Sequence, residues 1–141
     1  YPGNAYMLPF GKANIVQSGT KLTIVTWGEM LYRCLDASKN YSDNTIEIID
    51  LRTISPWDSN TVFSSVKKTG RCIVAHEDTM TCGFGSEISS SITSELFQFL
   101  DAPILRIATP DVPIPYNLSQ MSFVLPNRET IAEAIDKTLQ F

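Results

Sequence analysis

The chain has 141 residues, 43% of them hydrophobic and 18% charged, which suits one globular domain and is too short for two ordinary ones. Its formal net charge of -4 argues against a nucleic-acid surface, and no basic cluster is larger than Lys67-Lys68. We find no apolar run that could span a membrane and no signal peptide. From the charge we expect no nucleic-acid partner, and from the lack of such a run we expect no membrane partner.

The first twelve residues differ in pattern from the rest of the chain. They contain Pro2, Gly3, Pro9 and Gly11, and this density of chain-breaking residues predicts a linker or arm. We expect a single domain over residues 13–141. Because the first residue is a tyrosine and not a methionine, we also expect the sequence to be a fragment of a larger or processed chain.

The rest of the chain alternates between strand and helix patterns. Hydrophobic periodicity predicts strands at Ala13–Gln17, Leu22–Trp27, Thr45–Leu51, Arg71–His76 and Ile104–Ala108. It predicts helices at Glu29–Ser38, Ser59–Lys68, Gly83–Leu100 and Arg128–Leu139. Asp58 is placed to cap the second helix and Gly70 to end it, whereas the prolines of Thr109–Tyr116 predict an irregular loop.

This alternation predicts the fold class. Strands separated by helices form parallel sheets with helices on both faces, so the chain is predicted to be an α/β protein. The first short strand joins the second through the tight turn at Ser18-Gly19. We therefore expect that strand to run antiparallel at an edge of the sheet.

His76, the only histidine, is predicted to end a central strand, where open α/β sheets bind their ligands. Glu77 and Asp78 follow it, so it is a candidate general base oriented by a carboxylate. The other interpretation is a histidine that is hydrogen-bonded in a domain interface. The absence of an identifiable nucleophile, including any Gly-x-Ser-x-Gly elbow, favours the second interpretation and makes a small hydrolase remote.

Gly83-Phe84-Gly85 opens a helix after a strand, as phosphate-binding loops do. The third glycine of a dinucleotide fingerprint is missing, because Ile88 stands in its place. We expect the pair to allow close backbone packing, with anion binding as the second interpretation. Cys34, Cys72 and Cys82 have no metal-ligand spacing, and we expect buried thiols at Cys34 and Cys72.

Several motifs in order resemble the transketolase carboxyl-terminal domain of thiamine-diphosphate-dependent 2-oxo acid dehydrogenases, in the β subunit or the β half of a fused chain. The motifs are Leu8-Pro-Phe-Gly-Lys-Ala13, Asp50-Leu-Arg-Thr53, Pro56-Trp-Asp58, Val66-Lys-Lys-Thr-Gly-Arg71, Gly83-Phe-Gly-Ser-Glu87, Asp101-Ala-Pro103 and Pro110-Asp-Val-Pro-Ile-Pro115. The segments Pro56-Trp57-Asp58 and His76-Glu77 look more like the branched-chain (2-oxoisovalerate) enzymes than the pyruvate enzymes.

The resemblance implies a three-layer α/β/α sandwich with a mixed five-stranded sheet of order 1-3-2-4-5 and an antiparallel strand 1. It also implies that thiamine diphosphate and magnesium belong to the parent enzyme, in domains upstream, and that this fragment has no cofactor, metal or catalytic residue of its own. His76 would then lie near, rather than in, the parent active site. The location implied is the cytoplasm in a bacterium and the mitochondrial matrix in a eukaryote.

The resemblance further implies an assembly role. The domain would pack on its own upstream thiamine-binding domains, support a dimer with a second copy of the chain, and dock a lipoyl acyltransferase core. Asp101 and the terminal Phe141 match the positions whose carboxylates face a basic subunit-binding domain of that core. Desolvated carboxylates that meet lysine or arginine give fast and specific docking. Two alternatives remain, namely the same domain of a pyruvate dehydrogenase and a freestanding flavodoxin-like module that binds a small anion at Gly83–Ser86.

Overall fold

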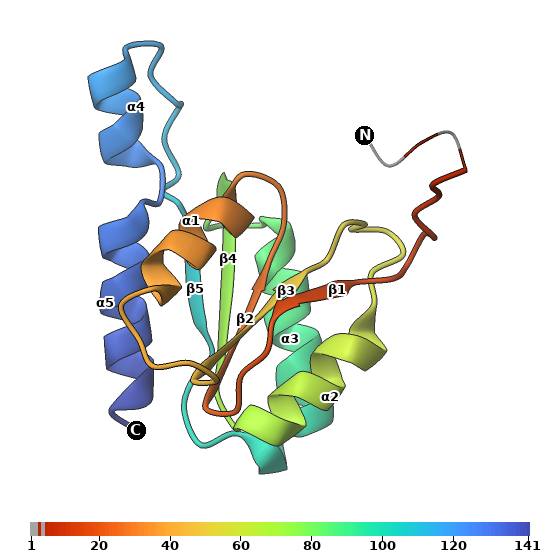
Figure 1. The fold of residues 1–141 in the computed structure, drawn as a ribbon. Coiled ribbons are helices and arrows are strands. Elements are labelled where there is room, and N and C mark those ends of the chain that lie inside the picture. The colour runs from red at the N-terminus through yellow and green to blue at the C-terminus, as the bar shows by residue number, and fades with distance from the viewer. Residues whose placement is uncertain (1–2, 4) are drawn as a thin grey trace.

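The computed structural model describes residue 3 and residues 5–141, in which a five-stranded sheet lies between two layers of helices (Figure 1). The strands are β1 (Asn14–Gln17), β2 (Leu22–Thr26), β3 (Ile46–Asp50), β4 (Cys72–Thr79) and β5 (Leu105–Thr109). The helices are α1 (Met30–Ser38), α2 (Ser59–Thr69), α3 (Phe84–Leu96), α4 (Leu118–Val124) and α5 (Arg128–Leu139), with a 3-10 turn, η1, at Phe97–Phe99.

The sheet has the order β1-β3-β2-β4-β5, which confirms the predicted topology. β1 runs antiparallel to β3 at one edge, and every other neighbouring pair is parallel. All five residues of the central strand β2 are buried, as expected of a parallel strand that is covered on both faces. The carboxyl ends of the parallel strands therefore share one end of the domain.

Two hydrophobic cores hold the helices to the sheet. On one face, α1 and α5 pack through Met30, Cys34, Ile131 and Ile135 onto alternate residues of the strands. On the other face, α2 and α3 pack through Val62, Val66, Ile88, Ile92 and Leu96. Successive side chains of a strand point to opposite faces, so each strand supplies residues to both cores. Figure 1 shows the two helical layers on either side of the sheet.

Both ends of α2 form as the sequence predicts. The Asp58 carboxylate accepts the backbone N–H of Thr61 at 3.2 Å and so satisfies one of the unpaired donors of the first turn. At the other end, Gly70 adopts φ 69°, a left-handed conformation that only glycine takes at little cost. The Gly70 N–H donates to the Val66 carbonyl at 2.9 Å and closes the helix.

The long helix predicted over Gly83–Leu100 is shorter in the structure. α3 ends at Leu96, and the chain then tightens into η1 before Leu100 adopts an extended conformation. Phe97 and Phe99 are exposed, whereas Leu100 packs against the core beneath α2 and α3. The tighter turn of η1 therefore lets Leu100 pack against the core and leaves Phe97 and Phe99 exposed to solvent.

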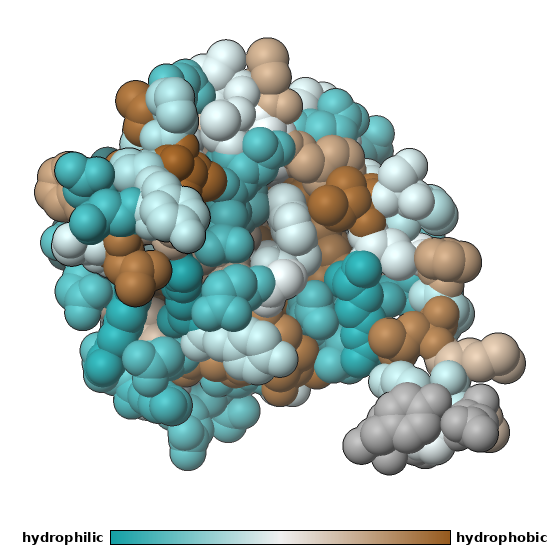
Figure 2. Space-filling model, turned by 90° about the horizontal axis from the view of Figure 1, so that it is seen from above, coloured by the Kyte–Doolittle hydropathy of each residue, from teal (hydrophilic) through white to brown (hydrophobic). Residues whose placement is uncertain are grey.

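α4 is an element that the sequence did not predict. It follows the proline-rich loop, and the Asn117 side chain caps it by accepting the Ser119 N–H at 3.0 Å. It has only seven residues and none of them is buried, and so short an apolar pattern does not distinguish a helix from a loop in a sequence. Seen from above, hydrophobic surface lies over this segment and, separately, over the amino-terminal arm (Figure 2); the exposed residues there are Met7, Phe10, Leu118 and Phe123.

Candidate functional site

β4 carries His76 into the interior of the domain. The strand continues to Thr79 rather than ending at His76 as predicted, because the Thr109 hydroxyl donates to the Glu77 carbonyl at 2.7 Å and pairing with β5 resumes at Thr79. The imidazole is fully buried and stacks on Trp27, with ring centroids 5.2 Å apart and an interplanar angle of 6°. His76 is therefore closed off from solvent within this domain.

The environment of His76 disfavours its charged form. Burial lowers the pKa of the imidazole; the Asp78 carboxylate opposes that shift, and the Arg106 guanidinium adds to it. Neither ring nitrogen has a hydrogen-bond partner among the described residues. The Glu77 carboxylate pairs with Arg33 at 3.5 Å, so one of the two acids that the sequence offered as orienting groups is engaged elsewhere.

Gly83 and Gly85 bring the start of α3 against β4. A Cβ at Gly85 would overlap the His76 Nε2, and a Cβ at Gly83 would overlap the Thr79 carbonyl oxygen. The prediction that this pair serves close packing is confirmed. The space beside the α-carbons of Gly83 and Gly85, where a phosphate-binding loop would hold its ligand, is occupied by Thr79 and His76.

Two hydroxyl groups in the first turns of α3 are also engaged in structure. The Ser86 hydroxyl accepts a hydrogen bond from Arg106, and the Ser89 hydroxyl donates to the Gly85 carbonyl at 2.8 Å. Cys34 and Cys72 are buried as predicted, and burial raises the pKa of each thiol to about 12. Within the described part of the chain, no three His, Cys, Asp or Glu side chains are grouped to hold a metal ion, and no helix is long and apolar enough to cross a membrane.

At the opposite end of the sheet, an open groove of about 830 Å³ runs beside α3 and the segment that enters β5. We call it the α3 groove. Its lining residues are Ser89, Ser90, Thr93, Ser94, Phe97, Leu100, Asp101, Ala102, Pro103, Ile104 and Phe141. One wall therefore carries hydroxyl groups from α3, and the other wall is apolar and aromatic.

Asp101 and Phe141, which are distant in the sequence, both line this groove. η1 and the turn after it bring Asp101 to the groove, and the end of α5 brings Phe141. The Asp101 side chain is 62% exposed and pairs with Arg71 at 3.5 Å, and Phe141 is 61% exposed. Among the described residues of the lining, Asp101 has the only ionisable side chain. One carboxylate among hydroxyls and aromatic rings can bind a partner but offers no acid–base pair.

Sequence reasoning did not identify the rest of the groove. Phe97 is 76% exposed and stands next to the hydroxyl wall of Ser90, Thr93 and Ser94. The signal was the spacing of Ser90, Ser94 and Phe97 at four and three residues, which places them along one side of α3 and η1. Because the predicted helix continued to Leu100, the exposure of Phe97 was not foreseen.

The fold and the groove define a three-layer α/β/α domain whose open surface is suited to binding. A family model described as "Transketolase, C-terminal domain" matches residues 11–131. The chain belongs to this transketolase carboxyl-terminal domain family, as the motifs predicted.

Curated relatives agree with this assignment. The chain is 45% identical over 131 residues to the mitochondrial β subunit of 2-oxoisovalerate dehydrogenase from Chaetomium thermophilum, covering 89% of this chain and 28% of that protein. It is 38% identical over 136 residues to the β subunit of the pyruvate dehydrogenase E1 component from Rickettsia conorii, covering 95% and 42%. The chain thus spans less than half the length of these relatives.

A solved structure shares the fold. The structure titled "Split gene transketolase, inactive beta4 tetramer" superposes with a TM-score of 0.83 at 20% identity, covering 98% of this chain and 45% of the other. At this identity the likeness concerns the fold alone. It matches the mixed five-stranded sheet described above.

Proposed function

We propose that the chain is the non-catalytic assembly and docking domain of the first component of a branched-chain 2-oxo acid dehydrogenase complex. The domain comprises residues 13–141, after an arm at residues 1–12 of which residues 1, 2 and 4 lie outside the described residues. The parent enzyme decarboxylates a branched 2-oxo acid with thiamine diphosphate and magnesium, which the upstream domains bind, and transfers the acyl group to lipoamide. The parent acts in the cytoplasm of a bacterium or in the mitochondrial matrix.

The observation that carries the docking role is the α3 groove. Asp101 and Phe141, the two residues that the family resemblance singles out, line the same groove. An exposed carboxylate beside exposed aromatic rings suits a partner that offers a lysine or arginine next to apolar side chains. The basic subunit-binding domain of a lipoyl acyltransferase core has that chemistry.

The exposed hydrophobic residues at the other end of the domain support the assembly role. Phe10 in the arm, and Tyr116 and Phe123 around α4, are each at least 85% exposed. Exposed apolar patches of this kind mark surfaces that other protein covers. The partners that would cover these exposed residues are the upstream domains of the parent chain and a second copy of the chain. His76 would have a structural role near that interface.

The docking role is tested by binding of the acyltransferase core to the assembled first component. We expect Asp101→Lys to weaken that binding by at least about tenfold, because a lysine would repel the partner's cation. Decarboxylation by the first component alone should be unchanged. Unchanged affinity for the core would reject the role.

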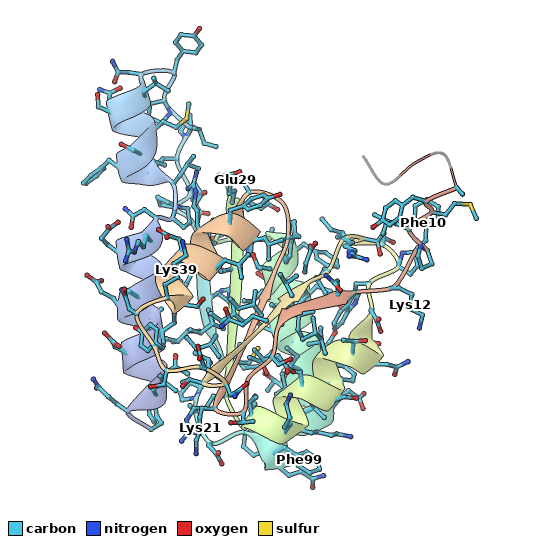
Figure 3. All side chains as sticks on the ribbon, viewed as in Figure 1. Phe10, Lys12, Lys21, Glu29, Lys39 and Phe99 are labelled. Atoms are coloured by element: carbon cyan, nitrogen blue, oxygen red, sulfur yellow. The ribbon has the colours of Figure 1, made fainter. Side chains whose placement is uncertain are left out.

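Asp101→Asn and Glu29→Gln form a matched pair for the same assay. Each removes one exposed carboxylate that pairs with a single arginine, Arg71 at 3.5 Å and Arg33 at 4.0 Å respectively. Figure 3 labels Glu29 near one end of the domain and Phe99, two residues before Asp101, near the other. Only Asp101→Asn should weaken binding of the acyltransferase core. Equal losses of affinity in Asp101→Asn and Glu29→Gln would mean that net charge, and not a specific site, controls docking.

The branched-chain assignment is a separate proposal, which the higher identity to the 2-oxoisovalerate enzyme supports. The pyruvate enzyme is the alternative. The comparison of kcat/KM for 2-oxoisovalerate and pyruvate in the assembled first component decides between them. A higher value for pyruvate would replace the branched-chain assignment and leave the docking role intact.

A further inference from the structure

The Asp101 carboxylate rests directly on Gly70, the residue that ends α2. The Asp101 backbone N–H donates to the Gly70 carbonyl at 2.7 Å, which fixes the two segments together. A Cβ at Gly70 would overlap the Asp101 Oδ2 and would lie 2.8 Å from its Cγ. The absence of a side chain at Gly70 therefore creates the place that the carboxylate occupies.

Arg71, the next residue, holds the same oxygen from the side. Its Nη1 donates to the Asp101 Oδ2 at 3.5 Å, and its side chain is only 20% exposed. The Arg71 Nε is buried and has no hydrogen-bond partner among the described residues. Packing thus holds the Arg71 guanidinium in place while it binds the Asp101 Oδ2. No described residue donates a hydrogen bond to the Asp101 Oδ1.

We propose that Gly70 and Arg71 are positioning residues that hold the Asp101 carboxylate at the rim of the α3 groove, with Oδ1 left for a lysine or arginine of the docking partner. This inference rests on the docking function proposed above. An exposed aspartate that is already oriented loses less side-chain entropy when a partner binds, so preorganisation raises the affinity. A surface ion pair as open as Arg71–Asp101 contributes little to folding stability, and stability alone does not account for the arrangement.

The test of Gly70 uses Gly28 as a matched control. Both glycines have left-handed backbones, with φ 69° and 62°, but a Cβ at Gly28 would meet nothing within 4 Å. Gly70→Ala and Gly28→Ala should therefore carry a similar backbone strain. We expect only Gly70→Ala to weaken binding of the acyltransferase's basic subunit-binding domain to the assembled first component, by about tenfold.

A double-mutant cycle shows whether Gly70 acts through Asp101. Once Asp101→Asn has removed the charge, the displacement of that side chain should matter little. Gly70→Ala should then cost no further affinity in the Asp101→Asn background, which is the non-additivity expected of two residues that act as a unit. Additive losses in the cycle would overturn the positioning role of Gly70.

Arg71 is tested by a charge-removing and a charge-keeping substitution. We expect Arg71→Gln to weaken binding about threefold, because the carboxylate gains rotamers that docking must again restrict. Arg71→Lys should restore most of the loss, since an ammonium can still engage Oδ2. Tighter binding by Arg71→Gln would mean that Arg71 competes with the partner, which would overturn the positioning role.

The same measurements separate a failure of this inference from a failure of the docking function. If Asp101→Asn leaves the affinity unchanged, the docking function fails. If Asp101→Asn weakens binding but Gly70→Ala and Gly28→Ala behave alike, docking stands and the positioning role of Gly70 is wrong.

Discussion

The two ends of the sheet differ in how their functional-looking residues are used. At the carboxyl end of β4, His76 is fully buried, stacks on Trp27 and packs against the first turn of α3. At the amino end of β5, Asp101 and Phe141 are more than half exposed and line an open groove. The space around His76 is filled by the domain's own side chains, whereas the α3 groove is open to solvent.

The difference shows that residue type does not identify a site in this fold. A histidine followed by two acids is a typical catalytic pattern, yet here burial lowers its pKa and its neighbouring glutamate pairs with Arg33. An aspartate and a phenylalanine are common surface residues, yet the fold brings them together. Exposure and mutual position, not chemistry alone, distinguish the two ends.

Of the changes made at the two ends of the sheet, the one that fills the space beside His76 should have the largest effect on stability. We expect Gly85→Ala to lower the free energy of unfolding by about 2 kcal/mol, because overlap with the His76 ring outweighs the gain in helix propensity. Urea unfolding followed by far-UV circular dichroism measures this change. In a His76→Ala background the same substitution should cost much less, and an equal cost there would show that the ring is not what Gly85 contacts.

A smaller effect should follow from pH. The pKa of His76 is lowered below its ordinary 6.5 in the folded chain, so the unfolded chain takes up the proton first as the pH falls. The free energy of unfolding should therefore decrease as the pH falls from about 7 toward 5. Urea midpoints across this range measure the slope.

His76→Gln is the control for the pH dependence. His76 is the only histidine, and the described carboxylates with lowered pKa, such as those of Glu47 and Asp58, lose their stabilising effect only at more acidic pH. The variant should therefore show a flat profile between about pH 7 and pH 5. A slope that persists in the variant would assign the dependence to other groups.

The smallest effect is expected at the open end. Phe97 is 76% exposed, so Phe97→Ala should change the free energy of unfolding by less than about 0.5 kcal/mol. Ile92→Ala on the same helix should cost about 3 kcal/mol, because Ile92 is fully buried. If Phe97→Ala destabilised the chain as strongly, the α3 groove would be part of the core and not an open surface.

Local signals predicted most of the fold. The Asp58 cap, the left-handed Gly70 and the buried β2 each depend on a few neighbouring residues, and each is as the sequence indicated. α4 was missed because its seven residues are too few for hydrophobic periodicity to distinguish a helix from a loop. The end of α3 at Leu96 was missed because it depends on how Leu100 packs against the core beneath α2 and α3, which is a tertiary contact.

The sequence by itself determined the α/β class through hydrophobic periodicity and the family through short motifs along the chain. The resemblance to that family, and no pattern of residues, singled out Asp101 and Phe141 as the residues proposed for docking. Only the tertiary structure decided that His76 is enclosed and that Asp101 lies on Gly70 beside Arg71 at an open groove. The reason is physical: burial and the approach of distant segments depend on how helices pack on the sheet, and no local pattern records that packing.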